Sequence, residues 1–364
     1  MTFGRPDRVP FNPGWPREST LAAWRTQGLP PGADWREHLL ETLGVEPGAI
    51  QESQGIGVDF RMIPQFEEKV LRHEGGHLIV QDWKGNICEI SDRFDLSYLR
   101  EARDFVTRRW LRCPVEGPSD WERMKDRYRL DSPGRFPADF DDRCRRAASR
   151  DLVLRVAFSG PFWQIREWCG FEGLCMMTIE RPRLVDAMAE FWTQFVAALL
   201  ERILRHVTPD AILISEDMAY KGKAMISPAM TRRFCAPAWN RWAAIARRAG
   251  VSVLEVDSDG FVGELIPLWI ESGLNACSPL EVAAGCDIND FRRRFGRSMA
   301  FSGGVDKRCI ARGGRPIGED LARIEPVLKG GGFIPSCDHG VPSDVCWPNF
   351  VDYARILARM TGWL

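Results

Sequence analysis

The sequence lacks several patterns that would assign it to a common class of protein. No apolar run approaches the roughly 20 residues that a membrane-spanning helix needs, and the first residues, Met1 to Pro6, contain no apolar signal core. No Gly-x-Gly-x-x-Gly motif follows a predicted strand, and no Walker-type phosphate loop is present. A formal net charge of −1 excludes the basic excess that binding to nucleic acid or acidic lipid requires. We therefore expect a soluble, cytoplasmic protein that binds neither nucleic acid nor membrane.

Cysteine is plentiful, but the sequence lacks any organised pairing of it. The 11 cysteines include no Cys-x-x-Cys pair, and their number is odd. A disulfide framework is therefore not expected, and a reducing compartment is the simpler interpretation. The length of 364 residues suits one large α/β domain with an extension.

The pattern of the sequence changes near residue 150. Before it, Trp, Arg, Pro and Asp are common, and short helices are predicted, including one over Leu96–Trp110. A β-hairpin is also predicted, with strands at His77–Asp82 and Asn86–Ser91 on either side of a Lys-Gly turn. We predict that residues 1–150 form an N-terminal extension that contributes to the barrel, that residues 151–364 form the main part, and that both belong to one domain.

From residue 151, apolar runs alternate with amphipathic helical stretches. The apolar runs predict buried strands at Leu152–Phe158, Ala211–Ser215, Ser252–Val256, Leu274–Cys277, Ser298–Ser302 and Phe333–Pro335. Alternation of continuously apolar strands with helices indicates a parallel sheet covered on both faces. Six such units, with weaker strands upstream, predict an α/β fold of the (β/α)8 TIM-barrel type, with a mostly helical N-terminal extension that contains the hairpin.

Carboxylates follow the third of these predicted strands. Asp257 and Asp259 are two residues apart, so the period of a strand places them on one face with Glu255, and we expect that face to look into the barrel. Stacked carboxylates repel one another unless a cation, a proton or hydrogen-bond donors compensate. A metal ion is one solution. The alternative is that Asp257 caps the next helix and Asp259 forms a turn with Gly260.

The last predicted strand leads into a second polar group, Cys337, Asp338 and His339. Cys337 and His339 are two residues apart and point the same way if the strand continues. Carboxylate, imidazole and thiolate together are typical of a zinc or iron site. A lone histidine is otherwise more often a satisfied polar residue. The predicted metal ligands are Asp257, Asp259, His339 and Cys337, with zinc or another divalent metal as the ion.

Polar side chains at the other strand ends complete the predicted rim of the barrel. For Glu216 and Asp217 the alternative is a helix cap or a surface ion pair. Asp306 is predicted to cap a helix, and Lys307 is a candidate anion ligand. The predicted catalytic residues are Glu216, Glu255 and His339, and the predicted substrate-binding residues are Trp163, Asp217, Tyr220, Lys221, Glu281 and Lys307.

Three segments carry a resemblance to a known family. The segments Phe158–Trp163, Glu216–Tyr220 and Asp338–Pro342 resemble the strand-to-helix turn, the Glu-led loop and the final Gly-His-Gly turn of the uroporphyrinogen decarboxylase superfamily. The resemblance covers about residue 152 to the end of the chain well and the N-terminal part loosely, and it implies a (β/α)8 barrel with its site at the carboxyl ends of the strands. The Arg-Gln-Ala-Gly-Arg segment that grips porphyrinogen carboxylates in the decarboxylases does not occur in this sequence.

The resemblance is closest in character to the corrinoid-linked methyltransferases of that superfamily. It implies transfer of a methyl group between a small methylated substrate, an ether or an amine, and a separate corrinoid-binding protein, and by analogy a homodimer. Those enzymes hold zinc with a His-x-Cys and a last-strand Cys, where this sequence has Asp257, Asp259 and His339. The alternatives are a decarboxylase or lyase acting on a small carboxylic acid or a tetrapyrrole-like substrate, and a binding protein for a tetrapyrrole or corrinoid carrier.

Overall fold

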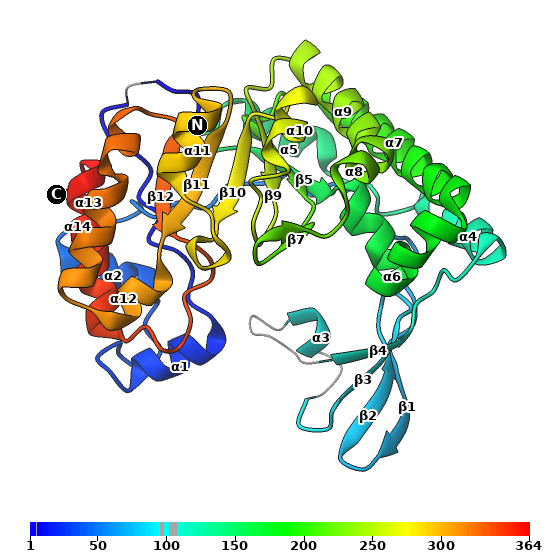
Figure 1. Ribbon diagram of the computed structural model, residues 1–364, viewed down its shortest axis with the longest axis horizontal. Helices are drawn as coiled ribbons and strands as arrows, with labels where there is room; N and C mark the ends of the chain where they lie inside the picture. The colour runs from blue at the N-terminus through cyan, green and yellow to red at the C-terminus, as the bar shows by residue number, and fades with distance from the viewer. Residues whose placement is uncertain (5, 95–97, 102–107) are drawn as a thin grey trace.

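The computed structural model describes the whole chain except residues 5, 95–97 and 102–107 (Figure 1). Its centre is a parallel six-stranded sheet in the order β12-β11-β10-β9-β6-β5. The strands are β5 Arg155–Ser159, β6 Ala211–Ser215, β9 Val253–Asp257, β10 Ala276–Leu280, β11 Ala300–Val305 and β12 Phe333–Cys337. The alternation of apolar runs and helices therefore predicted the parallel sheet correctly.

Several strands run further toward their carboxyl ends than hydrophobicity alone predicted. The backbone ladder pairs Asp257 with Ser278, so these two polar residues, which lie beyond the predicted ends of β9 and β10, still belong to strands. Backbone pairing does not depend on the apolar character of a side chain, and hydrophobic patterning misses such residues for that reason. These extra residues carry polar side chains toward one end of the sheet.

The predicted closed eight-stranded barrel is not found among the described strands. The sheet has two edges, β5 and β12, and each is extended by an isolated parallel bridge, Gln54 with Leu154 and Pro16 with Val341. The segment around Pro16 reads Asn-Pro-Gly-Trp-Pro, and a proline lacks the N–H that a continuous ladder needs. The observed fold is a mixed α/β structure whose N-terminal segments lie at both edges of the sheet.

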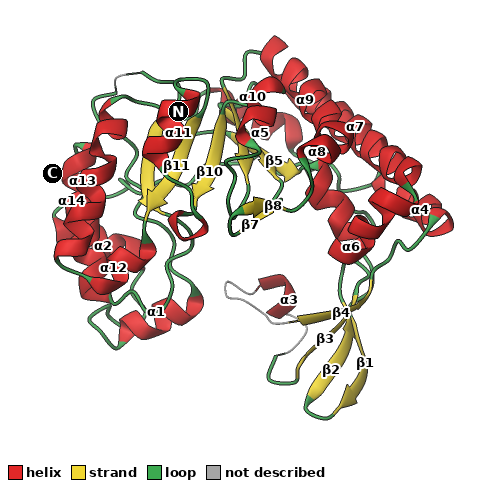
Figure 2. Cartoon of the chain, in the orientation of Figure 1, coloured by secondary structure: helices red, strands yellow, loops and turns green. Residues whose placement is uncertain are grey.

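Helices cover the outer side of the sheet (Figure 2). They include α6 Pro161–Glu180, α7 Pro182–Leu204, α8 Pro228–Phe234, α9 Ala236–Arg248, α10 Ile266–Glu271, α11 Ile288–Phe295, α12 Lys307–Arg312, α13 Arg315–Lys329 and α14 Trp347–Thr361. The predicted cap of α12 is confirmed, because the Asp306 side chain accepts a hydrogen bond from the Arg308 amide. Short elements at the carboxyl ends of the strands are β7 Ala219–Tyr220, β8 Lys223–Ala224 and the 3-10 helix Val282–Ala284.

The N-terminal region contains more β structure than predicted. Its helices are α1 Glu18–Arg25, α2 Trp35–Leu43, α3 Tyr98–Glu101, α4 Pro118–Lys125, the 3-10 helix Asp126–Tyr128 and α5 Phe140–Ala148. Its strands, β1 Lys69–Glu74, β2 His77–Gln81, β3 Ile87–Ser91 and β4 Arg108–Arg112, form an antiparallel sheet that projects from the body below α6 (Figure 1). The predicted hairpin, β2 with β3, is confirmed.

The helix predicted over Leu96–Trp110 is wrong at its end. Arg108–Arg112 pairs with β3 as a strand, because partners distant in sequence override local helical preference, while residues 95–97 and 102–107 lie outside the described part. The predicted division at residue 150 stays a prediction. Among the described residues, no helix combines the length and the apolar character that crossing a membrane requires.

Candidate functional site

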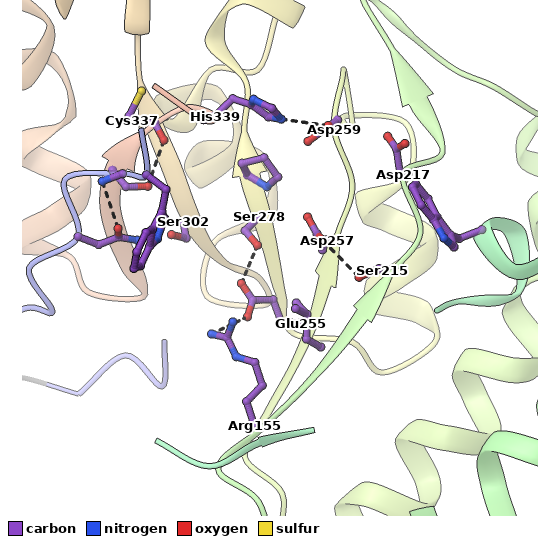
Figure 3. Close-up of a pocket in the computed structure, with 18 residues that line it drawn as sticks. Arg155, Ser215, Asp217, Glu255, Asp257, Asp259, Ser278, Ser302, Cys337 and His339 are labelled. Atoms are coloured by element: carbon purple, nitrogen blue, oxygen red, sulfur yellow. Dashed lines mark hydrogen bonds and ion pairs between the residues drawn. The ribbon is translucent and has the colours of Figure 1, made fainter. Parts of the chain in front are cut away.

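A cavity of about 580 Å³ lies against the parallel sheet, toward the carboxyl ends of its strands (Figure 3). Every strand of the six contributes to its lining, and so does the N-terminal segment near Trp15. The lining comprises Asn12, Gly14, Trp15, Arg155, Trp163, Leu213, Ser215, Asp217, Glu255, Asp257, Asp259, Ser278, Pro279, Ser302, Ser336, Cys337, His339 and Gly340. Its position is the one where parallel α/β proteins place ligands.

Glu255 is held in place deep in this cavity. Ser278 donates a hydrogen bond to one of its carboxylate oxygens at 2.7 Å, and a guanidinium nitrogen of Arg155 lies 3.5 Å from the other. Glu255 is only 4% exposed, so these two partners replace the water that an ionised carboxylate would otherwise need. We interpret Glu255 as an anchored charge in the wall of the cavity.

Asp257, the last residue of β9, is much less well compensated. Its carboxylate accepts one long hydrogen bond, from the Ser215 hydroxyl at 3.4 Å. Burial, followed by the nearby charges of Asp259, Glu255 and Asp217, raises the pKa of Asp257 to about 7. Near neutral pH this carboxyl group can therefore either hold or release a proton.

Asp259 and His339 meet at the cavity although 80 residues separate them in the chain. The imidazole Nε2 lies 3.1 Å from an oxygen of Asp259, and the Nδ1 lies 3.4 Å from a guanidinium nitrogen of Arg17. The hydrogen bond to Asp259 raises the pKa of His339. The structure thus brings together the ends of β9 and β12, as the positions of these residues in the sequence predicted.

Asp217 is fixed by Arg166 from helix α6. The two guanidinium terminal nitrogens bond the side chain of Asp217 at 2.9 Å and its backbone carbonyl at 3.0 Å. Asp217 has φ of 39°, an unusual conformation for a residue other than glycine, and the double contact with Arg166 helps to hold it there. The same guanidinium group lies 4.3 Å from the ring centre of Trp163, which lines the cavity.

Glu216 lies behind the cavity and is not among its lining residues. It is fully buried and accepts hydrogen bonds from the backbone N–H groups of Phe162 and Trp163 at 3.0 and 3.3 Å, and from the Trp239 indole at 2.6 Å. Burial raises the pKa of Glu216 to about 8, and the three donors oppose that rise. A Cβ atom on Gly160 would lie 2.1 Å from the carboxylate, so glycine is required there. Glu216 therefore anchors the first turn of α6.

The remaining predicted substrate-binding residues lie outside the lining. Tyr220 and Lys221 are exposed. The ammonium group of Lys307 lies 3.2 Å from Glu281 and 3.6 Å from Asp338, so its charge is already balanced within the protein. Glu281 in turn accepts a hydrogen bond from the Gly260 backbone. This network ties the loops after β9, β10, β11 and β12 together beside the cavity.

The four predicted metal ligands all line the cavity, but their arrangement does not fit a bound metal ion. Among the residues that the structure describes, no three His, Cys, Asp or Glu side chains converge closely enough to hold one. His339 directs its Nε2 at Asp259. Burial raises the pKa of the Cys337 thiol to about 12, which disfavours the thiolate that zinc binds. The mechanism proposed below therefore uses no metal.

Sequence reasoning missed the contribution of the N-terminal segment. Asn12, Gly14 and Trp15 line the cavity, and Arg17 reaches His339. A Cβ atom on Gly14 would lie 2.7 Å from the Cβ of Cys337, so this glycine, at φ of 99°, permits a close approach to β12. The Pro-Gly-Trp-Pro sequence signals a constrained turn, but nothing local indicates which distant strand it contacts.

Comparison with solved structures supports the fold. A methyltransferase from Methanosarcina mazei superimposes with a TM-score of 0.56 at 14% sequence identity, over 98% of this chain and 95% of that one. A B12-independent methionine synthase from Shewanella sp. W3-18-1 gives a TM-score of 0.42 at 11% identity, over 98% and 97% of the two chains. The first similarity indicates a shared fold, and the second is too weak to carry an argument. No family model matches the sequence, and no curated protein matches it.

Proposed function

We propose that this protein is a methyltransferase that moves a methyl group between a small methylated substrate and a separate corrinoid-binding protein. The observation that carries the proposal is the cavity at the carboxyl ends of the parallel strands, which Asp217, Asp257, Asp259 and His339 line. Its volume of about 580 Å³ suits a small substrate. The fold shared with the Methanosarcina mazei methyltransferase is consistent with this proposal.

The side chains that line the cavity would have separate roles. Asp257 would face the heteroatom of the substrate, and with a pKa of about 7 it could hold or release a proton there. Asp259 orients His339 through their hydrogen bond. Trp163, held by Arg166, forms an apolar wall against which methyl groups can pack. A corrinoid held by the partner protein would supply the cobalt nucleophile that accepts the methyl carbon.

The charge of the cavity makes the decarboxylase or lyase alternative less suitable. A small carboxylic acid would enter a space lined by Asp217, Glu255, Asp257 and Asp259, whose like charges repel it. Among the lining residues that the structure describes, Arg155 is the one permanent cation, and it already lies 3.5 Å from Glu255.

Methyl transfer is tested with free cobalamin reduced to the cobalt(I) state as the probe acceptor. The purified protein is incubated with methylated amines and methyl ethers, and methylation of cobalamin is followed by its visible spectrum. We expect enzyme-dependent methylation that Asp257→Asn reduces by about 100-fold or more. Asp131→Asn, a carboxyl-to-amide change at an exposed site, is the matched control and should retain full activity. Absence of methylation with every donor, using both free cobalamin and corrinoid-binding proteins, would contradict the proposal.

A further inference from the structure

The charge on the cavity walls is unbalanced in a way that points to the substrate. Asp217, Glu255, Asp257 and Asp259 place four carboxylates in the lining, against one guanidinium group, that of Arg155. Figure 3 shows the carboxylates of Asp217, Asp257 and Asp259 gathered in one part of the cavity. A cavity with this lining has a negative potential, which attracts cations and repels anions.

Most of these carboxylates already have a basic partner. Ion pairs join Arg166 to Asp217 at 2.9 Å, Arg155 to Glu255 at 3.5 Å, and His339 to Asp259 at 3.1 Å. Within the described part of the chain, Asp257 is the carboxylate of this lining that has no such partner. The unbalanced negative charge is therefore localised at the end of β9.

The surroundings of Asp257 do not stabilise its ionised form. Among the described residues, the Ser215 hydroxyl, 3.4 Å away, is the one side-chain hydrogen-bond donor to the Asp257 carboxylate. Asp217, Glu255 and Asp259 all face it with like charge, and burial removes water from it. A ligand with one positive charge would supply the missing partner.

Two indole rings give the cavity walls a second feature that suits a cation. Trp163 and Trp15 line the cavity, and each already lies near a guanidinium group elsewhere, Arg166 at 4.3 Å and Arg36 at 4.2 Å from the ring centres. The electron-rich faces of indole rings attract cations, and they suit methylated ammonium groups in particular, because these groups combine a diffuse charge with apolar methyl groups.

We propose that the cavity selects a methylated ammonium compound, with the nitrogen beside Asp257 and the methyl groups against Trp163. Its use as a methyl donor rests on the proposed function, whereas its binding does not. In the transfer step one C–N bond breaks, and its electron pair stays on nitrogen. The methyl carbon bonds to the two-electron cobalt nucleophile of the corrinoid-binding protein. The neutral amine leaves without needing a proton, and it no longer pairs with Asp257, which favours its release.

A neutral methyl ether fits the same walls less well. Ether cleavage would leave an alkoxide or phenoxide, and a protonated Asp257 that neutralised it would itself become a negative charge beside Asp217, Glu255 and Asp259. Such a substrate would also leave Asp257 either protonated or ionised without a counterion. The lining therefore favours the amine over the ether as the methylated substrate.

The test compares two probes that have the same shape and differ in charge. Choline carries a trimethylammonium group, and 3,3-dimethyl-1-butanol replaces its nitrogen with carbon. By isothermal titration calorimetry, we expect choline to bind at least about tenfold more tightly.

Variants test whether Asp257 is the residue that makes the cavity prefer the cation. Asp257→Asn should remove the preference for choline but leave binding of the alcohol unchanged, whereas Asp131→Asn should behave like the parent protein. Melting curves check that each variant is folded. If Asp257→Asn does not fold, the choice between the two probes by the parent protein still decides the proposal.

Each outcome separates this proposal from the proposed function. Equal affinity for the two probes, or binding of neither at millimolar concentration, would overturn the cation proposal even if methyl transfer from an ether were observed. Selective choline binding without methyl transfer from any ammonium donor to any corrinoid acceptor would support the cation site and contradict the methyltransferase function.

Discussion

Glu216 and Asp257 are neighbouring carboxylates with opposite environments. The backbone amide of Glu216 donates a hydrogen bond to the backbone carbonyl of Asp257 at 2.8 Å. Glu216 is fully buried and receives three N–H donors, whereas Asp257 faces the cavity and receives one long bond from a hydroxyl group. Burial raises the pKa of both groups, so burial does not distinguish them. The hydrogen-bond donors distinguish them. Three N–H groups make Glu216 part of the scaffold, whereas Asp257, with one long hydrogen bond, stays available to a ligand.

The largest expected effect on stability follows from replacing Glu216. In Glu216→Ala both acceptor oxygens are lost, so three buried N–H donors lose their acceptor whether the parent carboxyl, with its pKa of about 8, is protonated or ionised. We expect the free energy of unfolding to fall by about 2–4 kcal/mol. Chemical denaturation measures this change. A loss below about 0.5 kcal/mol would show that the three hydrogen bonds do not hold the first turn of α6.

Asp257→Asn should raise the free energy of unfolding, which is the opposite of the effect expected from replacing Glu216. The raised pKa of Asp257 means that the folded state binds its proton more tightly than the unfolded state, so the parent protein loses stability as pH rises from about 4 to about 7. The amide avoids this loss and should stabilise the protein by about 1–3 kcal/mol at pH 8, and by much less at pH 4. Denaturation of both proteins across this pH range measures the difference. A stabilisation independent of pH would contradict the assignment.

The smallest expected effect concerns Asp259 and His339, which are partly exposed. Asp259→Asn should lower the pKa of His339, measured by NMR titration of the imidazole ring. A histidine with a raised pKa stabilises the folded state below its unfolded pKa, and this contribution is lost as pH rises through the folded pKa. We expect the variant to be less stable in acid by under about 1 kcal/mol, and equally stable above that pKa. An unchanged imidazole titration would show that the contact does not persist in solution.

Much of the fold was predictable because it depends on local patterns. The strand β6 was predicted with its observed bounds, Ala211–Ser215, since its polar boundary coincides with the end of backbone pairing. The helix cap Asp306 was predicted because a capping side chain acts within three residues of its own position. The closed barrel was not predictable in this way, because closure depends on how N-terminal segments meet the edges of the sheet.

The candidate site was likewise predictable only where it depends on local sequence patterns. Period two in β9 correctly placed Glu255, Asp257 and Asp259 on one face, and all three line the cavity. Glu216 and Asp217 are adjacent in the sequence and looked equivalent, yet only Asp217 lines it. Which one faces the cavity depends on Arg166 and on the first turn of α6, and residue spacing does not encode these contacts.

The sequence by itself determined the parallel α/β arrangement and the concentration of polar side chains at the carboxyl ends of its strands, because both follow from periodicity within short segments. Tertiary structure alone decided which of those carboxylates acquire partners. Hydrogen-bond donors to Glu216 come from residues 162, 163 and 239, and the contact of His339 with Arg17 spans 322 residues. The charge state of a buried group depends on such neighbours, and only the folded chain brings them together.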